Sequence, residues 1–193
     1  MKKTLLALMS ATFFCTSAQA ITINSPNVPI TIFDNTSVTS TLDFTSHFII
    51  TDVNLTMNLT HTWDADLDIF LAHGGTEVEL TSDNGGSGND YTNTTFDDEA
   101  STAITAGTAP FTGFFRPEQL LSVFDGMDAF GTWTLKIRDD QSGDSGTLHS
   151  WSLAISGRST QENTNTVSEP ALLGLLGVGL FGLFSSRHFI RTV

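Results

Sequence analysis

The chain has 193 residues and a formal net charge of −13, with 21 acidic residues against eight lysines and arginines. This excess of negative charge excludes nucleic acid as a partner, because nucleic acid carries the same sign of charge, and it favours metal cations. A single cysteine excludes a disulfide framework.

Residues 1–20 have the features of a secretory signal peptide. A lysine pair precedes an apolar stretch, and small residues end at Ala20, as signal peptidase requires. We therefore expect export and cleavage after Ala20. Cys15, the only cysteine, lies in this leader, so the mature protein is expected to have neither a thiol nor a disulfide.

Residues 21–157 are long enough for one domain, and their apolar residues recur at every second position, which is the period of a half-buried strand. No amphipathic helix is expected before residue 168. The pattern predicts an all-β fold in which two antiparallel sheets form a sandwich, with Trp133 and Trp151 in the core and Trp63 at a loop rim. The expected strands are residues 30–33, 38–44, 53–61, 67–71, 77–80, 133–138 and 151–155.

Acidic clusters are the candidate sites of this domain. The first cluster, Asp64-x-Asp66-x-Asp68, has the opening spacing of an EF-hand loop, but Ile69 and Gly75 stand where that loop needs glycine and glutamate, so an EF-hand is excluded. A solvated polar face of a strand explains the spacing without metal.

Calcium accepts six to eight oxygen ligands in irregular geometry, and oxygen-rich loops follow the first cluster. Our hypothesis is a structural Ca²⁺ ion that joins these loops at one end of the sandwich. Ordinary turn chemistry, in which Asn, Gly and Asp supply positive φ, is the alternative. The candidate ligands are Asp64, Asp66, Asp83, Asp90, Asp97 and Asp98.

The segment Gly143-Asp144-Ser145-Gly146 has the sequence found around the nucleophile of chymotrypsin-like proteases. A serine nucleophile needs a histidine base and an orienting carboxylate. His61 and His73 precede it without the sequence context of that family, and Thr147 stands where a glycine is expected. We therefore expect a hairpin loop here, no catalytic residue, and a protein that is not an enzyme.

A polar linker is expected over residues 158–167, followed by a sorting or anchor segment over residues 168–193. The apolar run of residues 171–184 is shorter than the ~20 residues that a membrane-spanning helix needs, so a short hydrophobic helix with transient or permanent membrane anchoring is expected. The layout of Glu169-Pro170, the apolar run and the basic residues from Arg187 onward resembles the PEP-CTERM sorting signal of Gram-negative bacteria. That resemblance implies an exosortase-type processing enzyme as a partner.

Ordered blocks in the middle of the chain resemble the P domain, also called P/Homo B, of subtilisin-like proprotein convertases. The resemblance covers about residues 28–157 and implies a β-sandwich of jelly-roll type that supports a protease without supplying catalytic residues. No subtilisin-like domain is expected in residues 1–27. The matching blocks include Asp66-Leu67-x-Ile69-x-Leu71, Phe96-Asp97-Asp98-Glu99-Ala100, Gly131-Thr132-Trp133-x-Leu135-x-Ile137-x-Asp139 and Gly146-x-Leu148-x-x-Trp151-x-Leu153.

We expect an exported, non-catalytic P-domain protein at the outer surface or in the extracellular matrix of a Gram-negative bacterium, acting by binding or as a structural module. Two alternatives stay open. The first alternative is an accessory, stabilising subunit of a separate subtilisin-like serine endopeptidase. The second is a carbohydrate-binding jelly-roll module. An exposed apolar patch on one sheet would favour docking to a protein, such as a protease, whereas an aromatic-lined groove near Trp63 and Tyr91 would favour a sugar, such as an exopolysaccharide.

Overall fold

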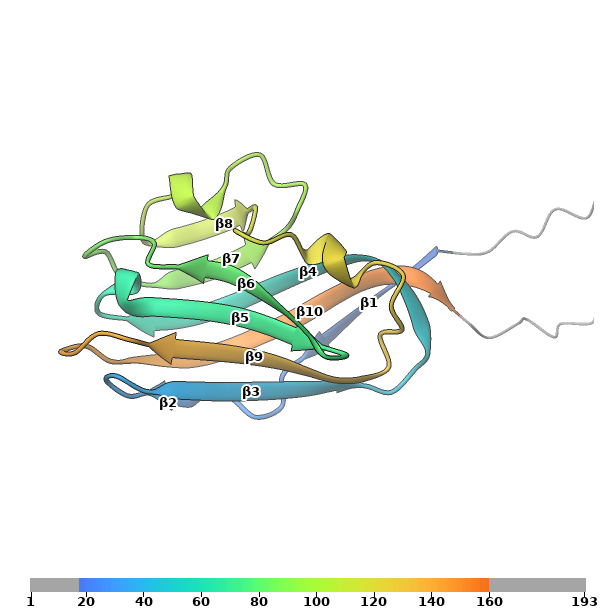
Figure 1. Ribbon diagram of the computed structural model, residues 1–193, viewed down its shortest axis with the longest axis horizontal. Coiled ribbons are helices and arrows are strands. Elements are labelled where there is room, and N and C mark those ends of the chain that lie inside the picture. The colour runs from blue at the N-terminus through green and yellow to red at the C-terminus, as the bar shows by residue number, and fades with distance from the viewer. Residues whose placement is uncertain (1–17, 160–193) are drawn as a thin grey trace, which may run out of the picture. The chain divides into compact units, whose positions relative to one another are not determined.

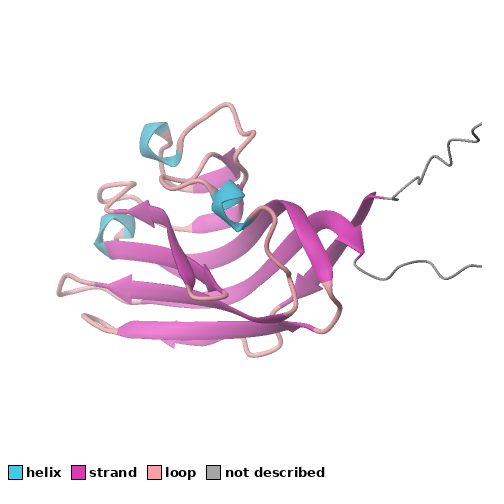
Figure 2. Ribbon diagram, turned by 45° about the vertical axis from the view of Figure 1, so that its right-hand side comes forward, coloured by secondary structure: helices cyan, strands magenta, loops and turns pink. Residues whose placement is uncertain are grey.

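The computed structural model describes residues 18–159, which form strands and short 3-10 helices. The predicted all-β fold is confirmed, because no α-helix occurs in these residues (Figures 1 and 2). The 3-10 helices are η1 (Asp64–Asp66), η2 (Ile104–Ala106) and η3 (Leu121–Phe124). The strands are β1 (Ala18–Asn24), β2 (Ile30–Ile32), β3 (Ser37–Phe44), β4 (Phe48–His61), β5 (Leu67–His73), β6 (Thr76–Ser82), β7 (Tyr91–Phe96), β8 (Phe111–Phe115), β9 (Gly131–Asp139) and β10 (Gly146–Ser159).

The strands form two sheets that face each other. The six-stranded sheet has the order β1-β10-β4-β7-β8, with β2 also pairing with β10, and the four-stranded sheet has the order β3-β9-β5-β6. Strand β4 shows why the sequence folds this way: Val53, Leu55, Met57 and Leu59 are buried, and the residues between them are not. Each sheet thus hides one face against the other.

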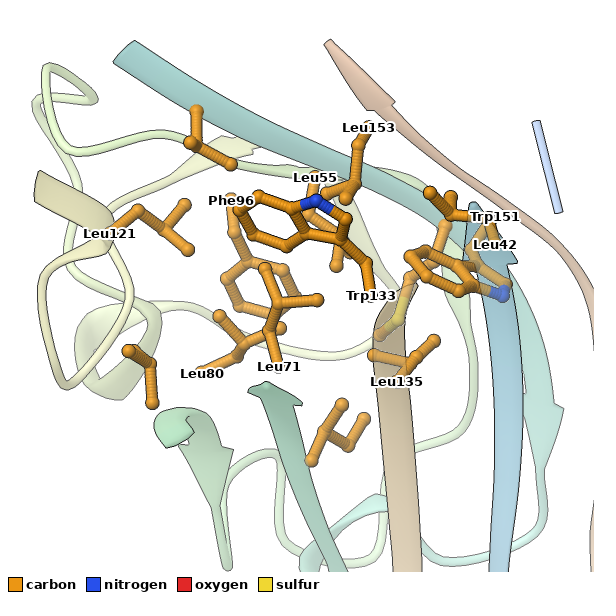
Figure 3. Close-up of a cluster of buried hydrophobic side chains, with 14 of the residues drawn as sticks. Leu42, Leu55, Leu71, Leu80, Phe96, Leu121, Trp133, Leu135, Trp151 and Leu153 are labelled. Atoms are coloured by element: carbon orange, nitrogen blue, oxygen red, sulfur yellow. The ribbon is translucent and has the colours of Figure 1, made fainter. Parts of the chain in front are cut away.

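The core lies between the sheets and contains both predicted tryptophans (Figure 3). Trp133 is 0% exposed and Trp151 is 2% exposed, which confirms the prediction. Each indole also satisfies its polar nitrogen: Trp133 Nε1 donates to the Ala129 carbonyl at 3.1 Å, and Trp151 Nε1 donates to Ser40 Oγ at 2.6 Å. Both residues can therefore be fully buried without leaving an unpaired donor.

The prediction of wholly antiparallel sheets is wrong at one place. Strands β7 and β8, which the sequence did not reveal, pair in parallel, with Tyr91 opposite Phe111 and Phe96 opposite Phe115. Neither strand has strict alternation of apolar residues, since Thr94 and Thr95 are both buried and Gly113 has a φ of 95°. A jelly-roll topology stays a prediction.

The connection of residues 139–146 is not the hairpin that the sequence suggested. It joins β9 in the four-stranded sheet to β10 in the six-stranded sheet, so it crosses between the layers. Gly146 begins β10, and a Cβ atom placed there would overlap the carbonyl oxygen of Thr60. Glycine is therefore needed for the close approach of β10 to β4.

Both ends of the described region lie on the same pair of strands. Ala18 is opposite Arg158 and Ala20 is opposite Ser156, so the residues just before the predicted cleavage point belong to β1. Strand β10 continues to Ser159, beyond the expected domain boundary at residue 157. Cleavage after Ala20 stays a prediction.

The predicted processing residues Glu169, Pro170 and Arg187 lie outside the described residues. Within residues 18–159, no helix is long and apolar enough to cross a membrane.

Candidate functional site

Three loops meet at one end of the sandwich, beyond the last residue of β4. The main-chain nitrogen of Asp64 donates to the Gly88 carbonyl at 2.9 Å, and that of Ala65 donates to the Gly86 carbonyl at 3.2 Å. The nitrogen of Asp140 donates to the Asp66 carbonyl at 3.0 Å. The loops of residues 62–66, 83–90 and 139–146 are thus linked by main-chain hydrogen bonds. We call this region the loop end.

Asp64 is the most unusual carboxyl group of the loop end. Its side chain is fully buried, and Oδ1 accepts a hydrogen bond from the Asp90 nitrogen at 2.9 Å. Oδ2 is buried and has no hydrogen-bond partner among the described residues. Burial raises the pKa of Asp64 to about 7, against the opposing effects of the Asp90 nitrogen and His61. Asp64 can therefore hold either a proton or a cation near neutral pH.

The other predicted ligands of this region lie nearby. Asp66 is 7% exposed, and its pKa is raised by desolvation and then by the charges of Asp144 and Asp139. The pKa of Asp83 is also raised by desolvation, followed by neighbouring carboxylates. Asp90 Oδ1 accepts the His61 main-chain N–H at 3.1 Å.

The interpretation of the first acidic cluster as a solvated polar face is wrong. Asp64, Asp66 and Asp68 are all buried. The 83–90 loop is bonded to this segment through the main chain, from Asp64 to Gly88 and from Ala65 to Gly86, which the local sequence pattern does not reveal. Asp68 accepts a hydrogen bond from Ser82 Oγ at 2.7 Å and lies 3.4 Å from Arg138 Nη1.

Asp97 and Asp98 lie elsewhere. They follow Phe96, which is opposite Leu55 on β4, whereas the loop end adjoins the other end of β7. Asp98 accepts hydrogen bonds from the main-chain nitrogens of Leu121 at 2.9 Å and Ser122 at 2.8 Å, so it anchors the start of η3. The structure thus does not bring all six predicted ligands together. No group of three or more His, Cys, Asp or Glu side chains within residues 18–159 has the arrangement to hold a metal ion.

A buried histidine and aspartate join the two sheets at the loop end, and sequence reasoning missed this pair. His61 Nε2 lies 3.1 Å from Asp139 Oδ2, with both side chains fully buried. His61 Nδ1 lies 2.8 Å from the Trp63 carbonyl oxygen. Both ring nitrogens thus have partners, and neither is available as a base for Ser145, which is exposed.

A shallow groove of about 500 Å³ lies beside these residues, lined by polar side chains that include Thr31, Thr60, Thr62 and Ser145. Trp63, next to Thr62 in the chain, is 43% exposed, as expected for a loop rim. An aromatic-lined groove near Trp63 and Tyr91 would have favoured a sugar ligand, but Tyr91 lines no groove. Its side chain is fully buried and stacks on Phe111 with 4.8 Å between ring centroids.

A second groove, of about 520 Å³, lies beside β6 and η3. Leu120 and Val123 line it and are 50% and 53% exposed. The neighbouring Leu121 and Phe124 are buried and anchor this segment to the core. The segment therefore holds two aliphatic side chains at the surface, beside this groove.

Comparison with known proteins gives one sequence match and several structural ones. Residues 50–155 match the family described as proprotein convertase P-domain. Comparison with curated proteins found no match.

Several solved structures match this chain, and three crystal structures are among them. The serine protease of Aeromonas sobria has a TM-score of 0.48 and 20% identity over 74% of this chain and 27% of that chain. A complex of the Aeromonas sobria serine protease and a chaperone has a TM-score of 0.43 and 21% identity over 74% of this chain and 26% of that chain. FlhE has a TM-score of 0.45 and 16% identity over 73% of this chain and 97% of that chain. The chain thus spans about a quarter of the two protease chains.

Proposed function

The chain belongs to the proprotein convertase P-domain family, and we propose that it acts as an exported, non-catalytic binding module. One observation supports this best: the imidazole of His61, which lines the same groove as Ser145, has both nitrogens engaged, by Asp139 and by the Trp63 carbonyl. His61 and Asp139, the pair that could have assisted a serine nucleophile, are therefore buried and connect the two sheets.

Peptidase activity of the purified protein tests this proposal. We expect no hydrolysis of a fluorogenic peptide library by the wild-type chain, and no change in the Ser145→Ala variant. Hydrolysis by the wild type that is lost in Ser145→Ala would overturn the non-catalytic assignment. The matched control is Ser142→Ala in the same loop, which lies outside the groove.

A second candidate function is that of an accessory subunit of a subtilisin-like serine endopeptidase. The exposed Leu120 and Val123 favour it, because they offer apolar surface for docking, Leu120 just before η3 and Val123 within it. Co-purification with a secreted subtilisin-like protease tests this candidate. We expect the wild type to capture the protease and the combined Leu120→Ser and Val123→Ser variant to lose capture. The Phe33→Ser control, which removes an even more exposed apolar side chain elsewhere, should keep it.

Export and sorting to the cell surface or matrix form part of the proposal and depend on the two terminal segments. Cleavage after Ala20 by signal peptidase and recognition of Glu169, Pro170 and Arg187 by an exosortase-type enzyme are the proposed steps. Intact-mass measurement of the protein recovered from the cell envelope and from the medium tests both. A recovered chain that still carries residues 1–20 would contradict the proposed leader.

Calcium binding is a separate proposal, now narrowed to the loop end. The buried Oδ2 of Asp64, which has no hydrogen-bond partner among the described residues, supports it, because hard cations prefer such oxygens. Main-chain carbonyls and water would complete the coordination shell. The proposal leaves out Asp97 and Asp98, because they follow the end of β7 that lies away from the loop end.

A further inference from the structure

Strand β6 is the outermost strand on one side of the four-stranded sheet (Figure 1). The Gln119 main-chain nitrogen donates to the Glu79 carbonyl at 3.0 Å, and Gln119 Oε1 accepts the Glu79 nitrogen at 3.1 Å. The nitrogen of Glu118 donates to the Leu80 carbonyl at 3.1 Å. The chain therefore runs beside the second half of β6 in the manner of an added strand, and it leaves β6 after Gln119 to form η3.

The first half of β6 has main-chain groups without such a neighbour. From the pair His73 and Thr76 to Glu79, β6 pairs with β5 residue by residue, without a bulge. Because the N–H and C=O groups of an antiparallel strand point alternately to its two sides, those of Glu77 point the same way as those of Glu79, away from β5. Among the described residues, no hydrogen bond reaches the Glu77 main chain from that side. Glu77 is also exposed, so this part of the edge is open to solvent.

The second groove, of about 520 Å³, lies against this open edge. Strand β6 contributes Glu77 and Val78 to its lining, and the segment that forms η3 contributes Leu120, Ser122 and Val123. Val78 is buried, whereas Leu120 and Val123 are exposed. The groove thus combines an open strand edge with exposed aliphatic side chains, and an extended peptide uses this combination when it adds to a sheet.

The surface beside the groove is acidic. Glu77 and Glu79 alternate with the core-facing residues of β6 and so share its outward face. Lys136 pairs with Glu77 at 2.8 Å, but Glu79 and Glu118 have no ion-pair partner in the part of the chain that the structure describes. Desolvation, followed by the charge of Glu118, raises the pKa of Glu79. A basic side chain from a partner would offset this repulsion.

We propose that the open edge of β6 binds an extended peptide of alternating basic and aliphatic residues, which continues the sheet as an added strand. Hydrogen bonds to the Glu77 main chain hold the peptide beside β6. Side chains of a strand alternate between the two faces of a sheet, so the aliphatic residues meet Leu120 and Val123 while the basic residues meet Glu79. This inference rests on the proposed function as a binding module and names the class of partner at this surface.

A second copy of the chain fits this edge less well than a basic peptide does. Two β6 edges placed side by side would bring the Glu79 and Glu118 carboxylates of both copies together, and each copy has a net charge of −13. Like charges on neighbouring strands are destabilising. A basic peptide supplies the opposite charge, so electrostatic complementarity favours it as the occupant.

Fluorescence anisotropy with labelled synthetic peptides tests the inference on the wild-type protein. The probe alternates lysine and valine, and a second probe alternates glutamate and valine. We expect the lysine probe to bind and the glutamate probe not to bind. Added salt should weaken binding of the lysine probe, because salt screens exposed ion pairs. Absence of binding by the lysine probe overturns the inference.

Methylation of the main-chain nitrogens of the probe tests strand addition separately from charge. Only every second N–H group of a strand points to a given neighbour, so one probe is methylated at its lysine nitrogens and another at its valine nitrogens. We expect one of these probes to bind about tenfold more weakly than the other, because only one set of N–H groups donates to β6. Equal affinities of the two methylated probes would overturn the inference.

Protein variants locate the binding site. Leu120→Ser and Val123→Ser combined should weaken binding about tenfold, because the aliphatic contact is lost. Glu79→Gln should weaken binding about fivefold and reduce its dependence on salt. Phe33→Ser and Glu99→Gln are the matched controls, since both side chains are exposed elsewhere. Groove variants that bind as tightly as these controls would overturn the inference.

Glu77→Pro tests the main-chain donor itself. Proline is tolerated on an edge strand where the N–H group faces solvent, so we expect the fold to persist and binding to fall about tenfold. Glu77→Gln is the matched control, because it removes the same carboxylate and keeps the N–H group. Equal affinities of the two variants would contradict strand addition at Glu77.

Sedimentation velocity tests for a second copy as the occupant. Dimerisation of the wild type that Glu77→Pro abolishes would assign the edge to self-association and overturn the inference. Failure of peptide binding is distinguishable from failure of the proposed function. A chain that binds no peptide probe but captures a secreted protein partner remains a binding module, without strand addition at β6.

Discussion

His61 and Asp139 are the last residues of β4 and β9, and their buried side chains connect the two sheets through a 3.1 Å contact between Nε2 and Oδ2. The same imidazole contacts the Trp63 carbonyl oxygen through Nδ1. This pair therefore fixes the loop end from both layers. Its two residues are 78 positions apart in the chain.

Removal of one partner of this pair should strongly destabilise the fold. Asp139→Ala leaves the buried His61 nitrogen without its acceptor, and breaking a buried pair costs about 3–5 kcal/mol. Urea unfolding followed by tryptophan fluorescence measures the change. Asp43→Ala, which removes an exposed carboxylate, should cost less than about 1 kcal/mol. Equal losses in both variants would contradict the structural role of the pair.

Asp64 should make the protein less stable as the pH rises toward neutral. Its pKa is raised from 3.8 to about 7 in the folded state, so the folded protein binds this proton more tightly than the unfolded chain. The resulting stability is fully present below pH 3.8 and is lost as the pH rises through about 7. Urea unfolding at a series of pH values should show that Asp64→Asn removes this decline. An unchanged pH profile in the variant would contradict the assignment.

Asp128 should have the opposite effect. Its pKa is lowered to about 2, chiefly by the His47 side chain and also by the main-chain nitrogens of Phe48 and Phe130. The stability that it contributes is present above pH 3.8 and is lost as the pH falls through about 2. In acid titration followed by circular dichroism, Asp128→Asn should weaken this acid sensitivity. An Asp128→Asn variant that loses stability between pH 4 and pH 2 as steeply as the wild type would disprove this role of Asp128.

Replacement of Gly146 should destabilise the crossing between the sheets. A Cβ atom would overlap the Thr60 carbonyl oxygen, and relief of such overpacking by backbone movement costs about 1–3 kcal/mol or more. Gly86→Ala is the comparison, because its Cβ would meet nothing within 4 Å and only left-handed backbone strain of ~1 kcal/mol remains. Thermal unfolding of Gly146→Ala and Gly86→Ala should therefore differ, with the first clearly lower in Tm.

Calcium should raise the Tm of metal-stripped protein if the loop end binds it. Calcium at about 100 times Kd, bound only by the folded state, would stabilise it by ~2.7 kcal/mol. Asp64→Asn should abolish the shift, and Asp97→Asn should keep it, since Asp97 lies outside the narrowed set. An unchanged wild-type Tm in millimolar calcium would end the proposal.

Strands with strict alternation could be predicted from the sequence, and the others could not. In β4, apolar residues at every second position mark the buried side directly. In β7, Thr94 is buried because its hydroxyl donates to the Phe111 carbonyl at 2.6 Å, a partner that local pattern does not reveal. The parallel pairing of β7 with β8 likewise depends on long-range register.

The sequence correctly grouped candidate-site residues only where their loops adjoin the same end of the sandwich. Asp64 and Asp90 lie together because β4 ends and β7 begins there. Asp97 was placed wrongly with them, since the length of β7 separates its two ends. Asp139 was missed because its role depends on a contact with a distant strand.

The pairing of Ala18 with Arg158 has a further consequence. Opposite residues of an antiparallel pair have Cα atoms ~4.5–5.5 Å apart, so the sandwich starts and finishes at nearly the same point. A unit with adjacent ends can be inserted into a surface loop of another protein without stretching the host chain. The same geometry makes the sandwich suitable for circular permutation, with new ends opened in an exposed turn such as Gly74-Gly75.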